Sequence, residues 1–117
     1  MAIFSSHLLN SIDGTHASKV KVSLIQINSQ GEKKFLFDTI TDENGRIYKE
    51  FNLTKDDCLC NFEIIVKIGD YFSNYDLNNS NKIVSEIVIR INMESNEKKY
   101  HIPIIISPNS YSIWWSK

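Results

Sequence analysis

The fold is decided by the end of the chain, YHIPIIISPNSYSIWWSK, which runs from Tyr100 to Lys117. Its first half alternates between two kinds of side chain, as a β-strand with one buried face does. Tyr100 shares one face with the isoleucines at 102, 104 and 106, and this face is uniformly apolar. His101 shares the other face with Pro103, Ile105 and Ser107. We expect the first face to lie in the core. The second is too apolar for free solvation, and we expect another subunit to cover it.

The same alternation recurs along the chain and predicts further short strands. GDYFSNYDL, residues 69–77, breaks the alternation and predicts one short helix, because its aromatic residues are spaced three to four apart. The dipeptide Asn44-Gly45 predicts a β-hairpin between the strands on either side of it. The sequence therefore indicates an all-β protein, an antiparallel β-sandwich with one short helix, in a single domain over residues 1–117. The predicted strands span residues 19–27, 32–41, 46–51, 61–68, 82–92 and the segment that starts at Tyr100.

Composition narrows the range of functions. Thirteen basic and fourteen acidic residues give a net charge of −1 without long blocks of one sign, which argues against general binding to nucleic acid or anionic membranes. Cys58 and Cys60 are too close in sequence for a comfortable disulfide, and a second cysteine pair for a zinc site is absent, so we expect no metal. The start lacks a basic leader, and no stretch approaches the ~18 apolar residues of a membrane span. We expect a cytoplasmic protein.

Three separated motifs carry a resemblance to a known family. YHIPIIISPNSYS resembles the closing signature of the 5-hydroxyisourate hydrolases, the transthyretin-related enzymes of urate breakdown. SSHLLNSIDGTHASKVKVSL resembles the opening motif of that family, and TDENGR resembles its Thr-x-x-Asp-Gly-Arg turn. The resemblance extends from residue 5 to residue 117. It implies a transthyretin-like sandwich of two four-stranded sheets, assembled as a homotetramer with active sites between dimers, and no cofactor.

The resemblance also implies a catalytic set. The functional polar residues of the family match His7 in the opening motif, Arg46 in the turn and His101 in the closing motif. Two histidines that titrate near neutral pH can divide the proton transfers of an amide hydrolysis. A guanidinium suits a flat heterocycle rich in carbonyl oxygens and stabilises negative charge in the transition state. His16 falls where the family usually has proline, and we interpret it as a loop residue.

The tail departs from the family. In the family the chain ends in Thr-Tyr-Arg-Gly-Ser, and this tail lines the active site. The present chain ends in Ile-Trp-Trp-Ser-Lys instead, so an arginine and a glycine are lost. We assign five residues of this region to the substrate pocket: Ser107, Ser112, Trp114, Trp115 and Lys117.

Two functions follow. The first is hydrolysis of 5-hydroxyisourate, a ring opening in purine degradation, with water activated by the histidine pair and the substrate positioned by Arg46. The alternative is a non-catalytic transthyretin-like homotetramer that uses the Trp114-Trp115 pair to bind a small ligand or a protein. A carbohydrate-binding sandwich is a third option, but it leaves the histidine pattern unexplained.

Overall fold

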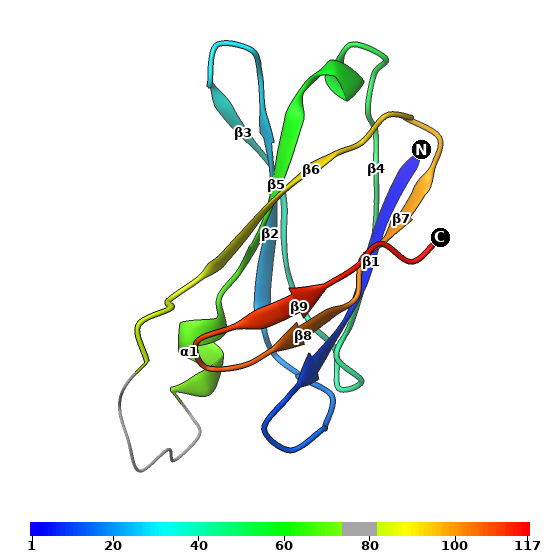
Figure 1. Cartoon of the computed structure of the whole chain (residues 1–117). Coiled ribbons are helices and arrows are strands. Elements are labelled where there is room, and N and C mark those ends of the chain that lie inside the picture. Colours follow the sequence, from blue (N-terminus) through cyan, green and yellow to red (C-terminus); the bar gives the residue numbers. More distant parts are fainter. Residues whose placement is uncertain (74–81) are drawn as a thin grey trace.

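The computed structural model describes residues 1–73 and 82–117, which form two β-sheets packed face to face (Figure 1). One sheet has five strands in the order β4-β1-β8-β9, with β7 also paired to β1. The other has four strands in the order β3-β2-β5-β6. The first sheet comprises β1 (Ala2–Asn10), β4 (Arg46–Phe51), β7 (Lys99–His101), β8 (Ile104–Ile106) and β9 (Tyr111–Ile113). The second comprises β2 (Lys21–Ile27), β3 (Lys33–Ile40), β5 (Asn61–Val66) and β6 (Ile87–Asn92).

The all-β sandwich is confirmed. The first sheet has five strands rather than the four that the resemblance implies, because one strand is divided into two segments. Strands β7 and β8 both run parallel to β1 in one continuous register, which pairs Ser5 with His101 and Leu8 with Ile104. Pro103 lies between the two segments and has no N–H to give to a ladder. The two short strands therefore fill a single place in the sheet. Their pairing with β1 is parallel, which differs from the predicted antiparallel arrangement.

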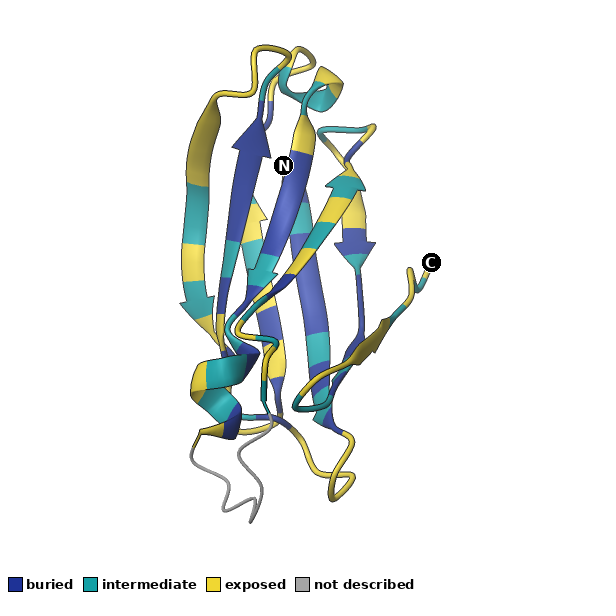
Figure 2. Cartoon of the chain, turned by 60° about the vertical axis from the view of Figure 1, so that its left-hand side comes forward, coloured by how far each residue is buried: buried dark blue, intermediate teal, exposed yellow. Residues whose placement is uncertain are grey.

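The core lies between the two sheets and follows the predicted alternation. Figure 2 shows buried residues concentrated on β1, β2 and β5, whereas the edge strands β3 and β9 are exposed or half-buried. The predicted apolar face of the closing segment is buried, since Tyr100 and Ile102 are each 5% exposed and Ile104 and Ile106 at most 1%. On the opposite face Pro103 is also buried within the chain, while His101 and Ile105 are half-buried.

Helix α1 (Ile68–Phe72) begins one residue before the predicted helix. Ile68 and Phe72 are fully buried and fix the helix against the core, whereas Tyr75 lies outside the described residues. A short 3-10 helix, η1 (Asp57–Leu59), was not predicted. No helix in the described part of the chain is long and apolar enough to cross a membrane.

The predicted hairpin at Asn44-Gly45 is wrong. The turn itself is tight, because Gly45 donates to the carbonyl of Asp42 at 2.9 Å and Asp42 donates to that of Arg46 at 3.0 Å. The strands on either side nevertheless enter different sheets: β3 pairs with β2, and β4 pairs with β1. The two strands separate after Thr41, a buried residue whose backbone N–H still donates to the carbonyl of Val20 next to β2.

Gly45 joins this turn to β1 at close range. Its φ of +72° lies in the left-handed region, and a Cβ added there would be 2.5 Å from the carbonyl oxygen of Leu8 and 3.1 Å from the backbone nitrogen of Ala17. The Leu8 N–H donates to the carbonyl of Gly45 at 2.8 Å. Only a glycine lets the two backbones approach in this way.

We expect Gly45→Ala to lower the free energy of unfolding by at least ~2 kcal/mol, because it adds a backbone clash to the cost of a positive φ. Urea denaturation measures this loss. Gly14→Ala is the matched control, since Gly14 has a φ of +73° with nothing within 4 Å, and should cost about 1 kcal/mol. Equal losses in the two variants would show that the close approach at Gly45 is unimportant.

Candidate active site

His7, Arg46 and His101 come together on the outer face of the five-stranded sheet. His7 lies directly opposite Arg46 in the antiparallel pairing of β1 with β4. His101 lies opposite Ser5 in the parallel pairing of β1 with β7. Because Ser5 and His7 are two residues apart on one strand, they point to the same face. The register thus places the three predicted residues side by side, although they are far apart in sequence.

The ring of His101 is held on one side. Its Nδ1 lies 2.7 Å from the Oγ of Ser5, a side chain that is only 5% exposed. Nε2 has no hydrogen-bond partner among the described residues, so it is the nitrogen available to a water or a substrate. Burial lowers the pKa of His101 below its usual range, and the charges of Lys99 and Arg46 lower it further, although a backbone hydrogen bond with Ser5 acts in the opposite direction.

His7 is held by a different partner. Its Nε2 lies 2.8 Å from the Nδ1 of His16, and the centroids of the two rings are 4.9 Å apart. Burial is the largest cause of a lowered pKa for His7, followed by the charges of Arg46 and His16, with a smaller effect from His101. A backbone hydrogen bond with Asn44 raises this pKa in part. The lowered pKa values favour two neutral imidazoles near pH 7, the form that accepts a proton.

A hollow of about 280 Å³ lies between β4 and β7. Arg46 and His101 line it together with Lys99, and Asp42 contributes the acidic group. The Asp42 carboxylate accepts from the backbone N–H of Asn44 and of Arg46, each at 2.9 Å, and so fixes the start of β4. His7 does not line this hollow but lies across the strand pair from Arg46. The remaining lining residues are Ser5, Ser6, Ile47 and Tyr48.

The predicted pocket residues of the tail are dispersed. Lys117 lies near His101, because both line a second hollow with Lys99 and Ser116, and the Ser116 N–H donates to the carbonyl of His101 at 2.9 Å. Ser112 is exposed and pairs with Ile105 on the outer face of the sheet. Ser107 lies at the turn after β8, where its hydroxyl contacts that of Ser11.

The two tryptophans are half-exposed and do not line the hollow beside Arg46. Trp115 lines a separate hollow of about 280 Å³ with Tyr100 and Ile102, whose side chains point to the face of the strand opposite to His101. The ammonium groups of Lys98 and Lys117 lie 5.0 Å and 5.1 Å from the Trp115 ring centroid. Lys117 thus lines a hollow with His101 while its ammonium group lies against the Trp115 indole.

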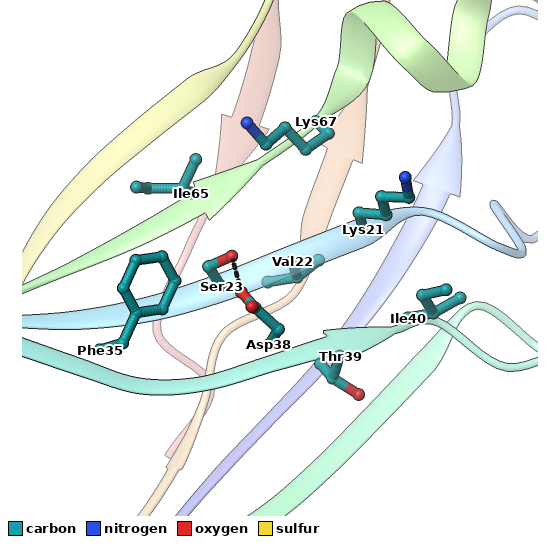
Figure 3. A pocket seen from close by; sticks show the side chains of 9 residues that line it. All are labelled: Lys21, Val22, Ser23, Phe35, Asp38, Thr39, Ile40, Ile65 and Lys67. Carbon is teal, nitrogen blue, oxygen red and sulfur yellow. Dashed lines mark hydrogen bonds between the residues drawn. The ribbon is translucent and has the colours of Figure 1, made fainter.

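A larger hollow, of about 710 Å³, lies on the outer face of the four-stranded sheet (Figure 3). Its apolar lining includes Phe35, Ile65 and Ile40, and the ammonium groups of Lys67 and Lys21 lie to the right of Phe35 and Ile65 in the view. The Asp38 carboxylate in its lining is already paired, because the Ser23 hydroxyl donates to it. It has no histidine and lies on the other sheet, so it is distinct from the site beside Arg46.

Sequence reasoning missed two residues of the site. Ser5 was detectable, since the two-residue period of a strand places it on the same face as His7. His16 was interpreted as a loop residue, and the structure does place it between β1 and β2, but in contact with His7. Nothing in the local sequence indicates that a loop folds back onto the strand before it.

Comparisons with known proteins agree with this fold. The model of the HIUase/Transthyretin family matches residues 4–115. A 5-hydroxyisourate hydrolase of Halalkalibacterium halodurans is 28% identical over 111 residues, which cover 94% of this chain and 93% of the relative. The solved structure of Klebsiella pneumoniae 5-hydroxyisourate hydrolase has a TM-score of 0.75 at 22% identity and covers 98% of this chain and 99% of its own. Transthyretin from Sparus aurata has a TM-score of 0.77 at 17% identity, and the match covers 97% of this chain and 95% of that transthyretin. The chain belongs to the HIUase/Transthyretin family.

Proposed function

We propose that this protein hydrolyses 5-hydroxyisourate by opening its ring. The observation that carries the proposal is the meeting of His7, Arg46 and His101 on one sheet face, with the pKa of both histidines lowered. Relatives that are 24% to 30% identical over nearly the whole chain are named 5-hydroxyisourate hydrolases, which supports this substrate. The family also includes transthyretins, so the site geometry, rather than the fold, carries the argument.

The geometry supports a division of roles in this hydrolysis. A water attacks the cyclic carbonyl while a neutral imidazole takes its proton, and the ring nitrogen takes a proton as the C–N bond breaks. His101 is the better placed base, because Ser5 holds its Nδ1 and leaves Nε2 free. Arg46 lies directly opposite His7 and lines the hollow together with His101, and it would stabilise the negative charge that develops on the carbonyl oxygen. His7 completes the set as the second proton-transfer group.

We propose a homotetramer in the cytoplasm as the working form. The outer face of the five-stranded sheet leaves Tyr48 57% exposed beside the half-buried His101, which a second subunit would cover. Cys58 and Cys60 are both free thiols, as is usual in a reducing compartment. Native mass spectrometry tests the assembly, and a monomer at working concentration would contradict it.

The deciding experiment is the ultraviolet decay of freshly generated 5-hydroxyisourate with and without the purified protein. We expect the protein to accelerate the decay in proportion to its concentration. A folded protein that leaves the decay unchanged would contradict the proposal.

The alternative, a non-catalytic binding protein, is favoured by one observation. The hollow beside Trp115 is lined by Tyr100, Ile102 and Ile91, with Lys98 and Glu94 as its charged residues, and the Lys98 and Lys117 ammonium groups lie near the indole. Such a surface suits a small aromatic ligand. Quenching of tryptophan fluorescence by such ligands, without any acceleration of 5-hydroxyisourate decay, would favour this function.

A further inference from the structure

The loop between β1 and β2 brings a third histidine to the candidate site. His16 Nδ1 lies 2.8 Å from His7 Nε2, with the planes of the two rings inclined by 32°. This distance is that of a good hydrogen bond between two imidazole nitrogens. His7 therefore enters the site with one of its two nitrogens already engaged.

The backbone on both sides of His16 is fixed to β1. The N–H of Asn10 donates to the carbonyl of Thr15, and the N–H of Ala17 donates to the carbonyl of Leu8, at 2.8 Å and 2.9 Å. These bonds make His16 the bridge partner of Leu9. Ala17 is fully buried, and its carbonyl accepts from the hydroxyl of Thr41 at 2.7 Å. The His16 side chain thus projects from an anchored backbone, although the ring itself is exposed.

A hydrogen bond between two imidazole rings needs an N–H on one ring and a lone pair on the other. Donation from the Nδ1–H of His16 requires that neutral His7 keeps its lone pair on Nε2 and carries its own proton on Nδ1. The contact between the rings therefore links the orientation of His7 to its tautomer.

We propose that His16 is a positioning residue, whose donation from Nδ1 holds His7 in one orientation and in the tautomer with the proton on Nδ1. Its part in turnover rests on the proposed function, whereas its hold on His7 does not. The inference is specific to this chain, because the bond needs a donor at position 16.

Burial and the charges that face His7 lower its pKa. Burial has the largest effect, and Arg46 from β4, His16 from the loop and His101 from β7 act in the same direction, whereas the backbone of Asn44 raises the pKa in part. The lowered pKa favours the neutral form of His7 near pH 7, which is the form that His16 orients.

The test is the replacement of His16 by phenylalanine or asparagine in the full chain. Phe keeps the ring shape but has no donor, whereas the Nδ2 of Asn lies near the position of Nδ1 and still donates. Long-range ¹H–¹⁵N correlation spectra report the tautomer and the titration of His7 without any substrate. We expect the Nδ1–H tautomer of His7 in the wild type and in His16→Asn, and a mixture of tautomers in His16→Phe.

Activity provides the second readout. We expect His16→Phe to lower kcat by ~10-fold, as misplacement of a reacting group does, and to shift the acid limb of the pH–rate profile. His16→Asn should stay within about twofold of wild type. If His7 has the same tautomer and titration in His16→Phe as in the wild type, the inference is wrong, whatever the activity. If the wild type leaves 5-hydroxyisourate untouched but the spectra change as expected, the proposed function fails and the hold of His16 on His7 stands.

Discussion

His101→Asn should lower kcat on 5-hydroxyisourate by at least ~100-fold and leave the unfolding transition nearly unchanged. Asparagine places a polar atom near the position of Nδ1, so it can still bond the hydroxyl of Ser5. It lacks the Nε2 that we assign to the attacking water. The expected loss is therefore chemical rather than structural, and it has the size that removal of a general base typically has.

A matched control comes from the same exchange at another histidine. His16→Asn also replaces an imidazole by an amide, but at a residue that we expect to position His7 rather than to touch the water. Steady-state kinetics on both variants, with urea denaturation alongside, separate the two roles. A wild-type kcat for His101→Asn would dismiss His101 as the base. An equal loss in both variants would show that the exchange itself, and not the role of His101, causes the effect.

Most of the fold was predictable because a strand with one buried face repeats every two residues. That period identified the core face of the closing segment, where Ile104 and Ile106 are buried. It did not identify strand partners. The turn at Asn44-Gly45 has the same local chemistry whether its flanking strands pair with each other or not, and the outcome depends on distant pairings, that of β3 with β2 and that of β4 with β1.

The residues of the candidate site were predictable to a similar extent. His7, Arg46 and His101 came from three motifs, and the strand register brings them together. Their roles stay a prediction until the kinetics are measured. The tail was harder, because beyond β9 no period fixes which way a side chain points, and Trp115 lies on the side of Tyr100 rather than of His101. The contact of His16 depends on how a loop folds back, which local sequence does not encode.

Arg46→Gln should lower kcat/KM by ~100- to 1,000-fold, the effect of losing one donor to a developing oxyanion. It should also move the acid limb of the pH–rate profile upward. The positive charge of Arg46 lowers the pKa of both His7 and His101, so these bases stay neutral to a lower pH in its presence. Without that charge both pKa values rise, the histidines protonate earlier as the pH falls, and activity is lost at a higher pH.

Arg46→Lys separates the charge from the shape of the guanidinium. Lysine keeps a positive charge near both histidines, so the acid limb should stay close to that of the wild type. It loses the planar fork that can hold two carbonyl oxygens at once, and KM should rise more than kcat falls. Coincident acid limbs for Arg46→Gln and the wild type would show that the charge does not tune the histidines. An unchanged KM and kcat in Arg46→Lys would show that the fork does not hold the substrate, and Arg46 would then act through its charge alone.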